Sequence, residues 1–231
     1  MKPVILCIET STAVCSAALG TADEIWYQAE NHDGQSHAVR LGQYVEKALA
    51  VLDEKGAKLA AVAVSSGPGS YTGLRIGVSM AKGVCYGRNV PLIGLPSLQV
   101  TAARVEADAD SLLCPMTDAR RMEVYTAVYN DRLEPMSDTQ ALVIDEHSLS
   151  GLPAGKKVYI FGDGAEKASK VIRREGVTFL EGLCPRAEDM LALADAALAA
   201  GRVEDTAYFE PFYLKEFQAT VPHKLNDLIH H

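Results

Sequence analysis

The stretch SSGPGSYTGLRIGVSMAKG, residues 65–83, runs a glycine-rich turn directly into an amphipathic segment. The apolar run LAAVAVSSG before it predicts a buried strand, and Ser70 is placed to cap a helix that we expect to end near Gly87. Free N–H groups at such a helix start can hold an anion. The stretch nevertheless lacks the GK[ST] ending of a phosphate-binding P-loop, and no lysine reaches the turn.

Small residues recur at every fourth position of this predicted helix: Gly73, Gly77, Ala81 and Cys85. An interior glycine costs a helix roughly 1 kcal/mol relative to alanine, so two at this spacing indicate a backbone that another element approaches closely. That element could be an internal strand or helix, or a helix of another chain.

The segments around the stretch predict a mixed α/β unit. Residues 3–9, 15–20 and 24–30 are apolar runs joined by short turns, which is typical of consecutive antiparallel strands. An amphipathic helix is expected to begin after a Ser36 cap and to stop at Gly56. A short strand, PLIG, and a helix over 96–107 complete the unit.

The pattern begins again near residue 110. Strands are expected within 111–130 and over 140–144 and 157–161, and helices from Gly164 to about Glu175 and over 186–201, before an extended segment at 206–214. Two β-β-β-α-β-α copies are the plan of the actin-like ATPase and sugar-kinase fold. We therefore predict an N-terminal lobe over 1–107 and a C-terminal lobe over 108–231, whose last helix or tail can pack back on the first lobe.

In that fold the first hairpin of each lobe cradles nucleotide phosphates. The corresponding turns give four candidate phosphate-site residues, which are Glu9, Ser11, Thr12 and Asp118. Both turns also have structural interpretations. Glu9 could be an ordinary residue at the end of a strand, and Asp118 could cap its turn or pair with a neighbouring arginine.

Composition restricts the partners and the compartment. The formal net charge is −8, and no basic stripe suits lone tRNA binding, so another chain is expected to hold most of any nucleic acid. The cluster Lys167, Lys170, Arg173 and Arg174 fits a solvated helix face. Five cysteines without a CxxC pair predict free thiols in a reducing cytoplasm, and no apolar run suggests a membrane span.

Motifs for common catalytic sites do not occur. There is no HExxH, HxxxH or GxSxG sequence, and His32 and His37 are five residues apart, which does not stack them on one helix face. We therefore expect no metal site. A peptidase of the M22 glycopeptidase type would need such a site, although a pair formed only in space stays open.

Several blocks together resemble the bacterial TsaB (YeaZ) family. They are GPGSYTGLRIGVSMAKG, ILCIETSTAVCSAAL, SHAVRL, PLIGLPSLQVTA and CPMTDARRMEVYTAVY. The resemblance covers about the first 130 residues and then thins to short agreements such as PFYLKEF. The paralogous TsaD family carries a similar GPG turn. Glu9 departs from the aspartate usual in the family, which weakens an intrinsic ATPase interpretation.

The resemblance implies an actin-like cytoplasmic protein that acts without catalysing. Such a subunit would bind and activate a TsaD-like transferase that makes threonylcarbamoyladenosine in tRNA, with a TsaE-like ATPase completing the assembly. It would meet tRNA only through the complex and form a homodimer when alone. No cofactor is expected to bind tightly, although ATP or ADP could sit at the partner interface. The alternative is a catalytic member of the superfamily: a nucleotide hydrolase, a kinase or an M22-type peptidase.

The resemblance also places the partner interface on the first two helices. The expected contact residues are His37, Arg40, Leu41, Tyr44, Tyr71, Gly73, Gly77, Met80, Ala81 and Val84. In this interpretation the small-residue stripe serves packing between subunits. Gly77→Leu or Ala81→Arg would then abolish pairing and leave the monomer folded, whereas an unfolded variant would indicate internal packing.

Overall fold

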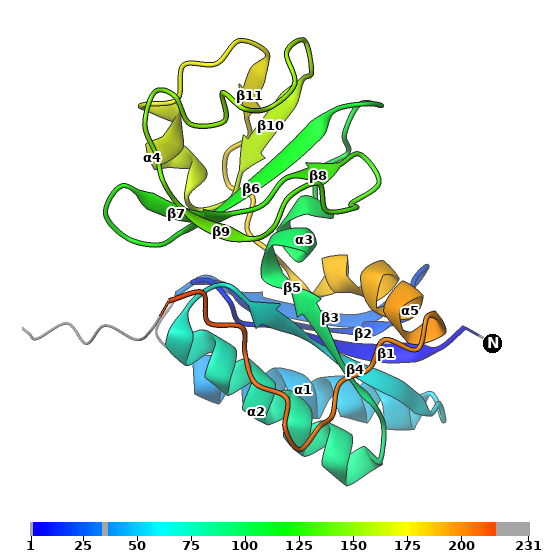
Figure 1. Cartoon of the computed structure of the whole chain (residues 1–231). Coiled ribbons are helices and arrows are strands. Elements are labelled where there is room, and N and C mark those ends of the chain that lie inside the picture. The colour runs from blue at the N-terminus through cyan, green and yellow to red at the C-terminus, as the bar shows by residue number, and fades with distance from the viewer. Residues whose placement is uncertain (1, 34–36, 216–231) are drawn as a thin grey trace, which may run out of the picture.

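The computed structural model describes residues 2–33 and 37–215 and shows two lobes, each built on its own sheet (Figure 1). In the first sheet, β1 (Val4–Glu9), β2 (Cys15–Gly20) and β3 (Ile25–Asn31) are antiparallel, and β4 (Leu59–Gly67) and β5 (Leu92–Pro96) run parallel to β1. The strand order is β3-β2-β1-β4-β5. The expected Ser36 cap and residues 216–231 lie outside the described residues.

Helices cover both faces of the first sheet. On one face lie α1 (His37–Glu54) and α2 (Tyr71–Arg88), and on the other α5 (Leu191–Ala199), which follows a 3-10 turn at Ala187–Met190 (Figure 1). β1 explains this sandwich, because Leu6 and Ile8 point into the core under α1 and α2 while Ile5 and Cys7 point toward α5.

The ends of α1 and α2 follow from local sequence. Gly56 adopts φ +59°, and the N–H of Ala57 reaches back to the carbonyl of Leu52 at 3.2 Å, which closes α1 where the sequence predicts. Ser70 caps α2 by accepting a hydrogen bond from the N–H of Gly73 at 3.3 Å, as expected. The helix ends at Asn89 with φ +50°.

The second sheet repeats the topology of the first. Its strands are β6 (Leu112–Asp118), β7 (Glu123–Thr126), β8 (Tyr129–Asn130), β9 (Gln140–Val143), β10 (Val158–Phe161) and β11 (Val177–Phe179). The order β9-β7-β6-β10-β11, with β8 paired to β6 at the side, matches β3-β2-β1-β4-β5. The predicted internal repeat is confirmed at the level of the sheets.

Two helices are shorter than predicted. α3 (Ser97–Ala102) and α4 (Ala165–Ser169) stop early, and the described chain has no helix between β9 and β10. The two units therefore are not both complete β-β-β-α-β-α copies. After α4, the Arg173 side chain donates to the carbonyls of Ser169 and Lys170, at 3.2 and 2.8 Å, so a side chain satisfies groups that a longer helix would pair.

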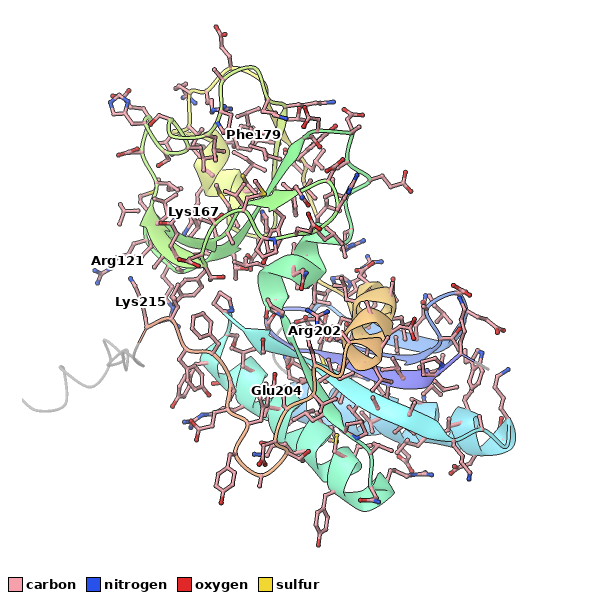
Figure 2. The ribbon with its side chains drawn as sticks, turned by 45° about the vertical axis from the view of Figure 1, so that its right-hand side comes forward. Arg121, Lys167, Phe179, Arg202, Glu204 and Lys215 are labelled. Carbon is pink, nitrogen blue, oxygen red and sulfur yellow. The ribbon has the colours of Figure 1, made fainter. Side chains whose placement is uncertain are left out.

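The chain returns to the first lobe after β11. Residues 203–215, here called the strap, run along α2 without regular structure (Figures 1 and 2). The N–H of Glu204 bonds the Leu92 carbonyl at 2.8 Å, and that of Phe212 bonds the Ser66 carbonyl at 2.7 Å. At its end Lys215 pairs with Glu123 of β7. α5 and the strap thus lie on the first lobe although they follow residue 108.

Cysteine placement agrees with the sequence. Cys7, Cys15, Cys85 and Cys114 are buried free thiols, and Cys184 is half-buried. Burial raises the pKa of Cys15 and of Cys85 to about 11, which keeps both as unreactive thiols. Among the helices in the described part of the chain, none has the length and apolar character needed to cross a bilayer.

Candidate functional site

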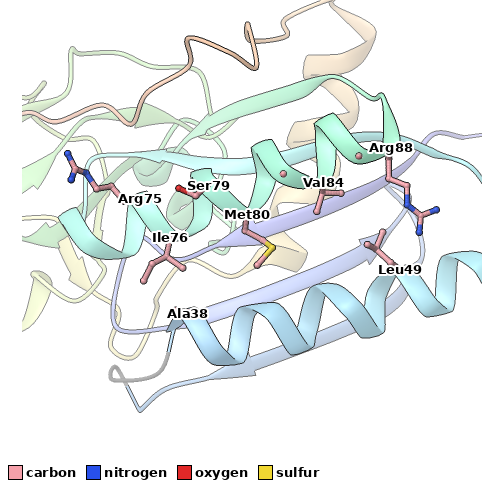
Figure 3. Close-up of a pocket in the computed structure, with 10 residues that line it drawn as sticks. Ala38, Leu49, Arg75, Ile76, Ser79, Met80, Val84 and Arg88 are labelled. Atoms are coloured by element: carbon pink, nitrogen blue, oxygen red, sulfur yellow. The ribbon is translucent and has the colours of Figure 1, made fainter.

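An apolar groove runs between α1 and α2 on the outer side of the first lobe (Figure 3). It has a volume of about 760 Å³ and is lined by Ala38, Leu49, Arg75, Ile76, Ser79, Met80, Gly83, Val84, Gly87 and Arg88. Ile76, Met80 and Val84 repeat every four residues and form its apolar floor along α2. Gly83 and Gly87 have open space where a side chain would stand, which widens the groove.

The small-residue stripe faces the other way. Gly73, Gly77, Ala81 and Cys85 are buried against the sheet. A Cβ on Gly73 would lie 2.1 Å from the carbonyl oxygen of Thr10, and one on Gly77 would lie 2.2 Å from Thr10 Oγ1. The expectation that this stripe serves packing between subunits is therefore wrong, because its close neighbour is the turn after β1 of the same chain.

The predicted interface residues divide into three groups. Gly73, Gly77, Ala81 and Leu41 are core residues, so none of them presents a side chain to a partner. Met80 and Val84 line the groove.

The other four do not line the groove. Arg40 is exposed. The ring of His37 lies 3.1 Å from the carbonyl oxygen of Thr12, and the hydroxyl of Tyr44 donates to the carbonyl of Glu30 at 3.3 Å. Tyr71 stacks on Tyr213 of the strap.

Most of the groove was not predicted from the sequence. The signal was present as a second stripe on α2, where Ile76, Met80 and Val84 share a face that packs only partly against the core. The glycines at 83 and 87 belong to that open side. The first stripe consists of small residues. Small residues allow close approach on either side of a helix, so their spacing alone does not identify the element that packs there.

The turn after β1 is closed by the chain itself. Glu9 is fully buried, and its carboxylate accepts hydrogen bonds from the Ser11 N–H at 2.5 Å and from the Ser65 hydroxyl. The carbonyl of Ser11 accepts the N–H of Ser70 at 2.7 Å, and a Cβ on Gly69 would come within 2.3 Å of that oxygen. The glycine-rich loop therefore packs directly on the turn.

Burial raises the pKa of Glu9, and this effect outweighs the hydrogen bonds from the two serines, which act in the opposite direction. A carboxylate that orients metal-bound water must be reachable from solvent. Glu9 is fully buried, and the candidate residues Ser11 and Thr12 beside it are buried as well. The geometry supports the structural interpretation of this turn.

The equivalent turn of the second lobe is occupied by a lysine. The ammonium of Lys167 contacts Asp118 Oδ1 at 2.8 Å, the Arg121 carbonyl at 2.9 Å and the Glu123 carbonyl. The carboxylate of Asp163 accepts the N–H of Asp118 at 2.8 Å. Asp118 thus caps its own turn and pairs with Lys167, where the sequence suggested Arg120 or Arg121 as partners.

Histidines and acids do not gather into a ligand set in the described chain. No group of three or more His, Cys, Asp and Glu side chains there could hold a metal ion. His32 lies 3.3 Å from Glu30, and His147 lies 3.5 Å from Glu146 beside it in sequence. His223 lies outside the described residues.

Comparisons with known proteins agree on one family. The model of the family described as TsaD: tRNA N6-adenosine threonylcarbamoyltransferase matches residues 31–222. The tRNA threonylcarbamoyladenosine biosynthesis protein TsaB of Escherichia coli is 30% identical over 219 residues, covering 91% of this chain and 94% of the relative. The protein of the same name from Bacillus subtilis is 34% identical over 143 residues, covering 61% and 62%.

Solved structures give the same result for the fold. YeaZ from Pseudomonas aeruginosa superposes with a TM-score of 0.76 at 27% identity, over 92% of this chain and 100% of that one. A second structure, described as an uncharacterized protein with similarity to peptidase YEAZ from the same organism, gives 0.77 with the same identity and coverage. The resemblance seen in the sequence is confirmed, and the chain belongs to the TsaB (YeaZ) family, with the actin-like two-lobed fold.

Proposed function

We propose that this chain is the non-catalytic partner subunit of a TsaD-like transferase in tRNA threonylcarbamoyladenosine biosynthesis. It docks on that subunit through the groove between α1 and α2. Its relatives carry the name of this pathway, and the matching family model carries the name of the transferase. A TsaE-like ATPase completes the assembly, and tRNA meets the chain only within it.

The groove is the observation that carries the proposal. An apolar hollow of this size on a helix pair is a common form of protein-docking surface, because it offers area that loses contact with water on binding. Its floor consists of aliphatic side chains and bare glycines, and charge enters only through arginines at the two ends (Figure 3). A polar small-molecule substrate would find few hydrogen-bond partners there.

The two lobe turns support a role without catalysis. In both, the groups that could hold phosphate or metal-bound water are engaged by the chain itself, through Ser65 and the glycine-rich loop in one lobe and Lys167 in the other. We accordingly expect any ATP or ADP to bind at the boundary with the partner rather than in a cradle made by this chain alone.

Reconstitution tests the proposal as a whole. The chain is mixed with a TsaD subunit, a TsaE-type ATPase, tRNA, ATP and threonylcarbamoyl-adenylate, and each component is omitted in turn. We expect modified tRNA only when both this chain and TsaD are present, and no ATP hydrolysis or tRNA modification by this chain alone. Hydrolysis of nucleotide or peptide by the lone chain would favour the catalytic alternative.

A matched pair of variants tests the docking face. Met80→Glu places a carboxylate on the groove floor and should weaken binding of the TsaD subunit by at least about thirtyfold, as expected for a charge buried in an apolar contact. Met136→Glu makes the same change at a methionine of the second lobe that is 62% exposed, and it should bind as wild type. Equal affinities of the two variants, measured by calorimetry, would place the docking face elsewhere.

A further inference from the structure

Two arginines stand at opposite ends of the groove and are held in different ways. Arg75 lies near the start of α2 and Arg88 at its end (Figure 3). The Arg88 guanidinium forms a two-point ion pair with Asp53 of α1, at 3.0 and 3.1 Å. The charge of Arg88 is therefore matched by a carboxylate of its own chain.

Arg75 has aromatic neighbours instead. Its guanidinium carbon lies 4.2 Å from the centre of the Tyr71 ring and 6.0 Å from that of Tyr213, and its Nε donates to the Tyr213 hydroxyl at 3.1 Å. The two rings are 4.8 Å apart. Arg75 forms no ion pair with any carboxylate in residues 2–33 and 37–215, and Glu210 of the strap acts on it only weakly.

This environment fixes the side chain while leaving its charge uncompensated. Only Nε is used by Tyr213, so the two terminal nitrogens, which form the flat fork that binds carboxylates, have no hydrogen bond to the described chain. An exposed arginine normally loses rotamer freedom when it binds. Stacking between Tyr71 and the strap removes part of that loss before a partner arrives.

We propose that Arg75 is the charged anchor of the docking face, that it receives a carboxylate of the partner subunit, and that Tyr213 of the strap positions it. The inference rests on the docking proposed above and adds the chemistry of the partner's contact residue. It also gives the strap a role, because a residue 138 positions along the chain holds a side chain at the rim of the groove. Charge complementarity favours an acidic partner surface at the Arg75 end, since the Arg88 end is already neutral.

Titrations of the full-length chain with the purified TsaD subunit test the anchor. Arg75→Gln should weaken binding about tenfold at low salt and flatten the salt dependence of the affinity, because a charge pair is lost. Arg75→Lys keeps the charge but not the fork, and should recover part of the loss. Arg132→Gln makes the same change at an exposed arginine of the second lobe that does not line the groove, and its affinity for the TsaD subunit should stay within about twofold of wild type.

Tyr213→Phe tests the positioning role. It keeps the ring beside Tyr71 and removes only the hydroxyl that holds Arg75. We expect about threefold weaker binding with the salt dependence of wild type, because the charge remains and only its orientation is freed. Thermal melts should match wild type for all these variants, since the side chains lie at the surface.

The outcomes separate this inference from the docking proposal. If Met80→Glu abolishes binding while Arg75→Gln binds as wild type with unchanged salt dependence, the groove docks the partner and the anchor is refuted. If Met80→Glu also binds as wild type, the docking proposal fails, and the anchor fails with it. If Arg75→Gln weakens only self-association, measured by sedimentation, a second copy supplies the carboxylate and the inference is overturned.

Discussion

Gly73 shows how a single hydrogen in place of a methyl group sets the position of α2. The helix lies against the turn after β1, and the hydroxyl of Thr10 donates to the Gly73 carbonyl at 2.8 Å. No side chain fits between the two backbones. The glycine-rich loop, the β1 turn and the start of α2 therefore form one rigid unit.

Alanine at position 73 should destabilise the fold. Its Cβ would overlap the Thr10 carbonyl, and relieving the overlap should cost more than the roughly 1 kcal/mol of helix propensity gained, for a net loss of about 2 kcal/mol. Gly83→Ala in the same helix meets open space and should raise the free energy of unfolding by up to about 1 kcal/mol. Urea denaturation of both variants measures the difference, and equal shifts would contradict the close contact.

A half-buried acid in the 3-10 turn before α5 gives a pH dependence. Burial raises the pKa of Asp189 to about 6, although Arg104 lies 3.4 Å from its carboxylate and acts against the shift. The folded state then binds more protons than the unfolded chain between the ordinary aspartate pKa and about 6. The stability that protonated Asp189 contributes is fully present below the ordinary aspartate pKa, and it is lost as the pH rises from there through about 6.

Asp189→Asn should remove this decline. Relative to wild type, the free energy of unfolding of the variant should increase by up to about 3 kcal/mol between pH 4 and pH 7. The decline that remains belongs to Glu9 and Asp163, whose pKa values burial also raises. Asp138→Asn on an exposed loop should keep the wild-type profile. Unfolding free energies across this pH range provide the measurement, and a parallel profile for Asp189→Asn would show that Asp189 is not the titrating group.

At the scale of elements, the strap is fastened to the first lobe by few side chains. The Phe209 ring packs against Gly94 of β5 and the adjoining core, and Lys82 bonds the carbonyls of Ala207 and Phe209 at 2.9 and 3.1 Å. The neighbouring Tyr208 is 84% exposed. This ring and this ammonium therefore hold the middle of the strap, between the backbone bonds of Glu204 and Phe212.

Phe209→Ala should release the strap without unfolding the lobes. We expect hydrogen exchange in residues 203–215 to accelerate by about tenfold or more, while exchange in β1 and β4 stays as in wild type. Tyr208→Ala removes the adjacent exposed ring and should change neither. Acceleration across the whole first lobe in Phe209→Ala would mean that the strap is part of the cooperative core.

Elements were predictable from sequence where the pattern is regular. Most strands of both sheets and the two long helices have the required pattern, and Ser70 and Gly56 mark helix ends, whereas the short β11 was not predicted. The strap was predicted only as an extended segment, because its partners on the first lobe lie more than 100 residues away and leave no local periodicity. The direction of the stripe at Gly73 and Gly77 was missed for a related reason, since helical spacing groups residues on a face but does not say what covers that face.

At the scale of the whole molecule, the net charge of the chain bears on which subunit of the proposed assembly binds tRNA. The chain carries a formal net charge of −8. In the second lobe, the ammonium of Lys167 is paired with Asp118 inside a turn. Counterion release from Lys and Arg contacts supplies most non-specific affinity for nucleic acid. The lone protein therefore lacks the main source of tRNA affinity.

We expect the chain alone to bind tRNA more weakly than about 10⁻⁴ M at physiological salt. Adding the TsaD subunit should give a complex that retains tRNA, and the salt dependence of that binding should match the value for TsaD alone, because the phosphate contacts belong to the partner. Fluorescence anisotropy with labelled tRNA measures all three cases. A steeper salt dependence in the complex than in TsaD alone would show that basic residues of this chain, with Arg121 and Lys170 on the second lobe as the first to replace, contact the phosphates directly.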